Sequence, residues 1–270
     1  MKKPMDKSLQ LMKDVVDQFN PTHIVSMVSG GYDSAASHAV ALELGLKVDL
    51  VIHGNTRCGI KQTTDWVRGQ HSNSKYGYAE ADAGTAYEDY VLRKGFFGKG
   101  INAHGFAYRV LKATPFRKVI SSEIRKGRRN HRVMLLNGAR QDESENRKRH
   151  LKPFRPDPAA PNNLWVNTIH DWSASDRDEF LFNRNIELNP VATALCRSGE
   201  CMCGTMQSKA ERIEAAAIYP DWGSWLDGLE AEARELHGFG WGDNAPKPTT
   251  QTSFDFQPMC SDCGKGNHND

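Results

Sequence analysis

Val25-Ser26-Met27-Val28-Ser29-Gly30-Gly31-Tyr32-Asp33-Ser34 is the stretch that decides the fold of this 270-residue chain. An apolar run ends at Ser-Gly-Gly-x-Asp-Ser, and small and apolar residues then continue at helical spacing to Leu42. This order predicts a strand, a tight loop and a helix. The two glycines let the backbone approach an anion closely or take a positive φ, and the first N–H groups of the helix face the same point. The stretch therefore predicts a phosphate-binding loop and a nucleotide site.

The polar side chains of this loop have separate predicted roles. Ser29 and Ser34 add hydroxyl donors for a phosphate. Asp33 would repel a bare phosphate, so it caps the helix, reaches a Mg²⁺ ion carried by the nucleotide, or does both. The spacing matches neither the Walker loop nor the Gly-x-Gly-x-x-Gly of dinucleotide-binding folds. A Ser/Gly/Asp turn that binds no ligand is the alternative interpretation.

The rest of the sequence alternates between strand and helix patterns. Apolar runs predict three further strands and two helices, at 48–53, 131–138, 164–169, 62–69 and 176–183. This alternation predicts an α/β fold, in which helices flank an open parallel sheet. We expect a nucleotide-binding domain over residues 1–190. A Cys-rich region over 191–270 would follow it, with a helix, a Pro/Thr-rich linker and a terminal Cys-x-x-Cys.

The charge balance restricts the partners. A formal net charge of +2 argues against a chain that coats nucleic acid uniformly. Two basic clusters form either a local polyanion-binding face or ordinary solvated surface, and both interpretations stay open. The clusters contain Arg117, Lys118, Arg125, Lys126, Arg128, Arg129, Arg147, Lys148, Arg149, His150, Lys152 and Arg155.

The amino-terminal segment predicts an amphipathic helix, not a signal peptide. Its apolar residues from Leu9 to Phe19 recur at helical spacing. No run approaches the roughly 18 apolar residues of a membrane span. We therefore expect a cytoplasmic protein with no membrane partner.

A second motif follows the predicted strand at 131–138, where the chain reads Gly138-Ala139-Arg140-Gln141-Asp142-Glu143-Ser144-Glu145-Asn146-Arg147. Ligands of an open parallel sheet bind at the carboxyl ends of its strands, so Arg140 is expected on the same edge as Gly30. There it would offer a forked donor to a phosphate or sulfate. Glu143 and Arg147, four residues apart, equally suit an exposed ion pair on a helix.

The loop from Ser29 to Ser34 resembles the PP-loop of ATP pyrophosphatases. Together with the Gly-x-Arg-x-x-Glu-Ser-x-x-Arg pattern, it makes residues 20–205 similar to the phosphoadenosine phosphosulfate (PAPS) reductase family, and to its phage and DNA-phosphorothioation types. Weaker likenesses lie at Phe97-Gly98, His104, Tyr108, Lys112, Trp172, Asp176 and Asn189-Pro190. The resemblance implies a Rossmann-like adenine nucleotide α-hydrolase fold.

The resemblance also implies roles for single residues. Arg140 would contact a phosphate or sulfate beside Gly138, and Glu143 and Arg147 would organise that contact. The nucleotide phosphates would be held by Ser29, Gly30, Gly31, Asp33 and Ser34.

Five of the six cysteines are clustered, namely Cys196, Cys201, Cys203, Cys260 and Cys263. Without a secretory signal, closely spaced cysteines indicate metal thiolates or redox groups rather than disulfides. Four thiolates suit either Zn²⁺ or a [4Fe–4S] cluster, and both stay open. The resemblance favours [4Fe–4S], with Cys260 or Cys263 as the fourth ligand. Cys58 is expected on the ligand-binding edge, where it is either part of the site or an ordinary loop thiol, and both interpretations stay open.

Three functions are compatible with these motifs. In the first, which the intact loop favours, ATP with Mg²⁺ adenylates an acceptor and a sulfur nucleophile then displaces AMP. In the second, a cysteine thiolate reduces PAPS to sulfite and leaves adenosine 3′,5′-bisphosphate. The family motif Glu-Cys-Gly-Leu-His for this activity is matched only in part, at Glu200-Cys201. The third is a non-catalytic nucleotide-binding module with a zinc ribbon for nucleic acid.

The first two functions share their predicted catalytic residues, which are Asp33, Arg140 and Cys201. The expected partners are an adenine nucleotide, a DNA, tRNA or small-molecule acceptor, a sulfur donor or thiol reductant, and a second copy of the chain in a homodimer.

Overall fold

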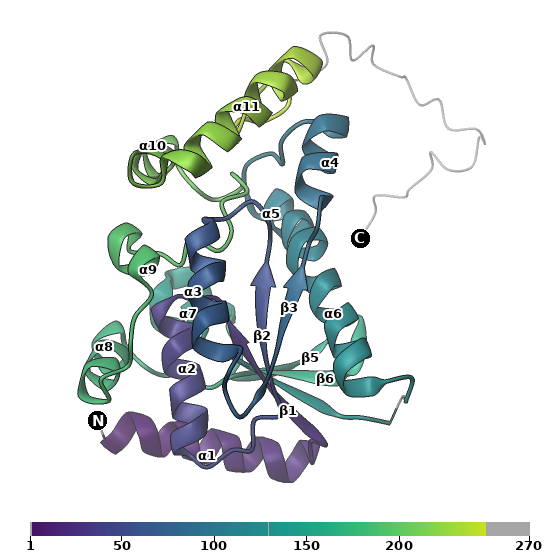
Figure 1. Cartoon of the computed structure of the whole chain (residues 1–270). Coiled ribbons are helices and arrows are strands. Elements are labelled where there is room, and N and C mark those ends of the chain that lie inside the picture. Colours follow the sequence, from purple (N-terminus) through teal and green to yellow (C-terminus); the bar gives the residue numbers. More distant parts are fainter. Residues whose placement is uncertain (1, 129, 247–270) are drawn as a thin grey trace, which may run out of the picture.

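The computed structural model describes residues 2–128 and 130–246 and contains a six-stranded sheet (Figure 1). The strand order is β3-β2-β1-β4-β6-β5; β5 runs antiparallel to β6, and the other neighbours are parallel. The bounds are β1 (His23–Val28), β2 (Leu50–Asn55), β3 (Gly77–Asp82), β4 (Val133–Asn137), β5 (Phe154–Asp157) and β6 (Ala160–Asn167). The predicted α/β class with an open, mostly parallel sheet is confirmed.

Helices cover both faces of this sheet. The α-helices are α1 (Lys2–Phe19), α2 (Tyr32–Glu43), α3 (Lys61–His71), α4 (Ala86–Lys94), α5 (Ile101–Tyr108), α6 (Thr114–Val119), α7 (Glu145–His150), α8 (Ala174–Asn183), α9 (Pro190–Leu195), α10 (Lys209–Ile218) and α11 (Pro220–His237). Two π-helical segments, η1 (Arg109–Ala113) and η2 (Ile120–Arg125), and the 3-10 helix η3 (Gln141–Glu143) complete the helical elements of the described residues. None of the helices in the described ranges is long and apolar enough to cross a membrane.

The central strands are apolar on both faces because both faces are covered. Val25 and Leu135 pair across β1 and β4 and pack against α6 and η2 on one face. Val28 and Met134 point to the other face, where they meet α1, α2 and α3. This alternation follows from the period of two residues in a strand.

A further apolar cluster joins the carboxyl-terminal helices to α4 and the α5–η1 helix. Its largest fully buried side chains include Tyr87, Phe97 and Trp241. The cluster also contains Cys58, from the β2–α3 loop, and Cys203. Of the predicted Cys-rich region, residues 191–246 are described, and Cys260 and Cys263 lie outside the described residues.

The strand order reverses between β1 and β4, because the chain builds β2 and β3 on one side of β1 and β4, β6 and β5 on the other. In an open parallel sheet, this switch point leaves a crevice at the carboxyl ends of the two strands. Both sequence motifs begin at this crevice. The first starts at Ser29, directly after β1, and the second starts at Gly138, directly after β4.

Candidate functional site

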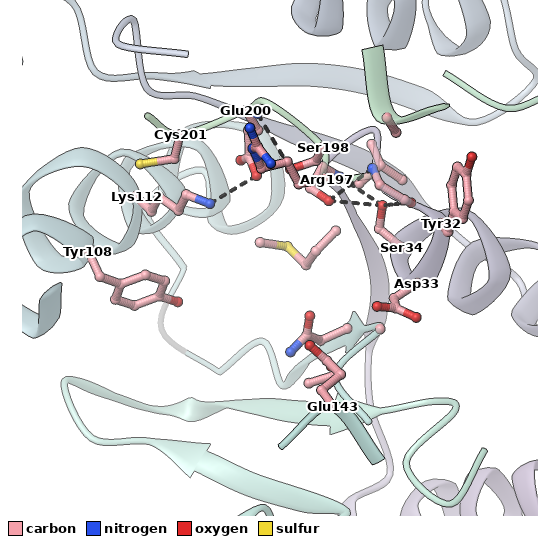
Figure 2. A pocket seen from close by; sticks show the side chains of 18 of the residues that line it. Tyr32, Asp33, Ser34, Tyr108, Lys112, Glu143, Arg197, Ser198, Glu200 and Cys201 are labelled. Atoms are coloured by element: carbon pink, nitrogen blue, oxygen red, sulfur yellow. Dashed lines mark hydrogen bonds and ion pairs between the residues drawn. The ribbon is translucent and has the colours of Figure 1, made fainter. Parts of the chain in front are cut away.

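The loop between β1 and α2 is closed by its own hydroxyl groups. The backbone N–H of Ser29 donates to Ser34 Oγ at 3.1 Å, and Ser34 Oγ donates to the carbonyl of Gly31 at 2.8 Å. The two serine hydroxyls lie 3.1 Å apart (Figure 2). The helix begins directly after the loop, so its first N–H groups lack partners within the helix and are available to an anion.

Gly30 is the residue that this turn requires. Its φ is +77°, and a Cβ there would lie 2.9 Å from both Asn189 Nδ2 and the methyl group of Thr63. The side chain of Asn189 donates to the carbonyl of Gly30 at 3.1 Å. The loop is therefore held from behind by a buried amide, and a side chain at Gly30 would displace that support.

Asp33 accepts hydrogen bonds from two arginines. Arg140 Nε donates to its Oδ1 at 2.6 Å, and Arg177 Nη1 donates to the same oxygen at 2.9 Å. No hydrogen bond among residues 2–128 and 130–246 falls on Oδ2, which leaves that oxygen for a cation on a bound nucleotide. The cap of α2 is Gly31 and carries no side-chain hydrogen bond, so the interpretation of Asp33 as the cap is wrong.

The second motif is packed tightly against the first. A Cβ at Gly138 would lie 2.3 Å from the carbonyl oxygen of Asp33, so only glycine fits where β4 passes the start of α2. Glu143 accepts from the backbone N–H of Arg140 at 2.8 Å and forms an ion pair with Arg147. Glu143 and Arg147 both line the cavity described next.

The two motifs open onto a cavity of about 730 Å³. Ser29, Gly31, Asp33 and Ser34 line one side of it. Figure 2 shows Tyr108, Lys112 and Cys201 on another side. Apolar and aromatic groups complete the lining, among them Met27, Phe116 and Trp165. A cavity with one phosphate-sized polar loop and apolar surface nearby suits a nucleotide.

A buried ion pair lies on the side of the cavity away from the loop. Lys112 Nζ contacts Glu200 Oε2 at 2.9 Å, and the Glu200 side chain is only 5 % exposed. Burial opposes the charge of Lys112, but Glu200 and Cys201 outweigh it and keep the pKa of Lys112 above its usual value. The cation therefore stays charged at neutral pH beside the cavity. On the same α5–η1 helix, burial, with smaller contributions from Lys112 and Arg147, lowers the pKa of His104.

Three thiols meet behind this ion pair. Cys201 lines the cavity and lies within hydrogen-bonding reach of both Cys58 and Cys203. Cys58 is fully buried, and Cys203 is 2 % exposed. Hydrogen bonding with Cys203 lowers the pKa of Cys201, but hydrogen bonding with Cys58 and burial outweigh it and raise the pKa to about 12.

The predicted metal-ligand set is not assembled in the part of the chain that the structure describes. Cys196 is exposed at the end of α9, whereas Cys201 and Cys203 turn inward to Cys58. Within residues 2–128 and 130–246, no group of three or more His, Cys, Asp or Glu side chains has a geometry that could hold a metal ion. The described residues therefore do not fit the [4Fe–4S] cluster or Zn²⁺, and no chemical step is assigned to either.

The basic residues do not form one surface. Arg117 is paired with Asp157 at 2.8 Å, and Arg125 donates to Asn163 at 2.6 Å. The residues around Arg125 precede β4, at the end of the sheet opposite the cavity. Among the described residues of the two basic clusters, Arg147 of α7 lines the cavity, and Arg129 lies outside the described residues.

The structure brings together most of the residues predicted from sequence. Ser29, Gly31, Asp33, Ser34, Gly138, Glu143, Arg147, Cys196, Cys201 and Cys203 line the cavity, together with His104, Tyr108 and Lys112. Arg140 is 4 % exposed, and its guanidinium group is turned to Asp33. No sequence pattern pointed to Arg177, which reaches the loop from α8, or to Ser198, whose Cβ lies 3.2 Å from the Cβ position of Gly31.

A phosphate-sized loop at the switch point of an open parallel sheet defines a nucleotide-binding α/β protein. The family comparison agrees with this class. Residues 23–206 match the phosphoadenosine phosphosulfate reductase domain model, and the chain belongs to that family.

Two solved structures are similar to this chain. Phosphoadenylyl-sulfate (PAPS) reductase from Candida auris, in a phosphate complex, has 13 % identity and a TM-score of 0.46, and the match covers 69 % of this chain and 83 % of that one. NMN synthetase from Francisella tularensis has 13 % identity and a TM-score of 0.47, and the match covers 92 % of this chain and 98 % of that one. Among curated protein sequences, none matches significantly.

Proposed function

We propose that this chain cleaves ATP to AMP and pyrophosphate in order to adenylate an acceptor for sulfur transfer. The observation that carries the proposal is the complete loop from Ser29 to Ser34, which is closed by its own hydroxyl groups beside the first N–H groups of α2. A pyrophosphate leaving group carries several negative charges, and such a loop stabilises them as the α–β bond breaks.

Each group of the site has a role in this reaction. Ser29 and Ser34 hold the pyrophosphate, and Asp33 Oδ2 reaches the Mg²⁺ of the substrate. Arg140 and Arg177 fix that carboxylate through its other oxygen, so they act as positioning residues. An acceptor oxygen attacks the α-phosphorus, pyrophosphate leaves, and a sulfur nucleophile then displaces AMP from the acceptor. DNA, tRNA or a small molecule is the proposed acceptor, and Cys201 is the proposed sulfur carrier.

Reduction of PAPS to sulfite is the second candidate function. It is favoured by Cys201, because this thiol lines the same cavity as the loop and lies close to the charge of Lys112. The Cys201 thiolate would attack the sulfur of the sulfo group, and the bond from that sulfur to the phosphate oxygen would break. Adenosine 3′,5′-bisphosphate leaves, and a thiosulfonate remains on Cys201. A thiol reductant then attacks Cys201 Sγ, sulfite leaves, and a disulfide remains.

A binding competition separates the two functions. Chain purified without oxygen is titrated with Mg-ATP and then with PAPS by calorimetry. Under the first proposal, ATP binds and PAPS does not displace it. The Asp33→Asn variant then gives no heat of binding with Mg-ATP. Preferential PAPS binding would overturn the first proposal in favour of the second. Gly228→Ala, which changes an open position on α11, serves as the matched control in both titrations.

A further inference from the structure

The segment that carries Cys201 is fixed against the segment that carries Cys58. Ile60 N–H donates to the carbonyl of Gly199 at 2.7 Å, and the hydroxyl of Thr56 donates to the carbonyl of Glu200 at 2.5 Å. A Cβ at Gly59 would lie 2.1 Å from that same Glu200 carbonyl oxygen. Hydrogen bonds on both sides of Cys58 therefore fix the distance between the two segments, independently of the thiols.

The thiols of the two segments differ in access. Cys201 lines the cavity, whereas Cys58 is fully buried and its Sγ lies 3.5 Å from the hydroxyl of Thr56. Trp222 closes the far side, where its indole N–H donates to the carbonyl of Cys58 at 3.1 Å. Of these two thiols, Cys201 is therefore the one that a reagent in the cavity contacts.

We propose that Cys58 and Cys201 form a reversible redox pair, in which Cys201 reacts from the cavity and Cys58 resolves it from behind. A small disulfide R–S–S–R is the oxidant. The Cys201 thiolate attacks one of its sulfurs, and one RS⁻ leaves. The Cys58 thiolate then attacks Cys201 Sγ, the second RS⁻ leaves, and a Cys58–Cys201 disulfide remains. Two thiols lose two electrons and two protons, and R–S–S–R gains two electrons.

This arrangement has a consequence for the nucleotide site. A resolving thiol inside the protein releases whatever sulfur group Cys201 carries without an external thiol entering the cavity beside the nucleotide. Cys203 is the competing partner, because it too lies within hydrogen-bonding reach of Cys201. It is only two residues away along the chain, and such a short ring strains the geometry that a disulfide needs.

Tryptic peptides of this chain distinguish the possible bonds. Cys58 lies alone in the peptide 58–61, Cys196 in 185–197, and Cys201 and Cys203 share the peptide 198–209. The reduced full-length chain is treated with glutathione disulfide at mildly alkaline pH without nucleotide, its free thiols are alkylated, and the digest is analysed by mass spectrometry. The expected product joins 58–61 to 198–209. It is retained in Cys203→Ser and Cys196→Ser and is lost in Cys201→Ser.

Three results would overturn the redox pair: a disulfide within 198–209, a stable glutathione adduct on Cys201 with Cys58 still reduced, or stoichiometric iron or zinc held by these thiols after anaerobic purification. Circular dichroism checks that Cys201→Ser is folded, and Cys58→Ala, which must also lose the joined peptides, is the second variant. The assay contains no nucleotide, so its result is independent of the proposed function.

Discussion

Substitution of Gly138 by alanine tests the contact between the two motifs of the site. The added methyl carbon would lie 2.3 Å from Asp33 O, 2.4 Å from Asp33 C and 2.8 Å from Ser34 N. All three are backbone atoms of the loop and α2, so no side-chain rotation relieves the contact. Carbon and oxygen prefer a separation of about 3.5 Å, so β4 and α2 must move apart by roughly 1 Å.

The cost of this movement can be bounded. Overpacking of a filled site destabilises a protein by about 1–3 kcal/mol. For a chain of this size, each kcal/mol lowers the melting temperature by about 2–4 °C. The same displacement moves Asp33 and Ser34 relative to the other phosphate-binding groups. We therefore expect nucleotide affinity to fall by about tenfold, which corresponds to about 1.4 kcal/mol.

Calorimetry and thermal unfolding measure the two effects. Gly228→Ala is the matched control, because a Cβ there has no atom within 4 Å and the position lies inside α11. It is expected to stabilise the protein by about 0.5–1 kcal/mol, since alanine favours a helix. If Gly138→Ala kept both the wild-type melting temperature and the wild-type nucleotide affinity, the close approach of β4 to α2 would be refuted.

Three further changes test other parts of the site. Asp33→Asn is expected to abolish Mg-nucleotide turnover while circular dichroism stays native, because the amide lacks the charge that binds Mg²⁺; full activity would remove Asp33 from the site. Because the pKa of Cys201 is raised to about 12, its thiolate is scarce at neutral pH, so its alkylation rate should rise about tenfold per pH unit from pH 7 to 10. Lys112→Met should shift that profile to higher pH, since Lys112 lowers the pKa of Cys201, and an unchanged profile would contradict the contact. Arg125→Gln should leave nucleotide affinity unchanged, because Arg125 lies at the opposite end of the sheet, and a clear loss would contradict that placement.

The strands that position the site were predictable because they are buried on both faces. β1, β2 and β4 are rich in apolar residues, and a sequence shows such stretches directly. The two edge strands were missed. β3 is partly exposed and carries polar residues, and β5 is four residues long and contains Pro156. Edge strands have this composition because one side of their backbone lacks a pairing partner.

The site was predictable where its residues belong to local motifs. Ser29, Asp33 and Gly138 follow the ends of strands, so their position follows from the strand itself. Arg177 lies on a helix 144 residues after Asp33, and no spacing rule connects the two. The contact of Cys58 with Cys201 likewise depends on how the β2–α3 loop packs against the segment after α9, which only the tertiary structure determines.

One segment, residues 189–201, links the phosphate loop to the thiols. Asn189 at its start supports the loop through the carbonyl of Gly30, and Ser198 packs against Gly31. Two residues further on, Glu200 pairs with Lys112, and Cys201 follows directly. The thiol and the phosphate loop are therefore joined by a short stretch of backbone. A nucleotide held by the loop would occupy the cavity that Cys201 lines, and would thereby limit the access of glutathione disulfide to this thiol. The rate at which glutathione disulfide joins the two thiols should thus change when the nucleotide is bound.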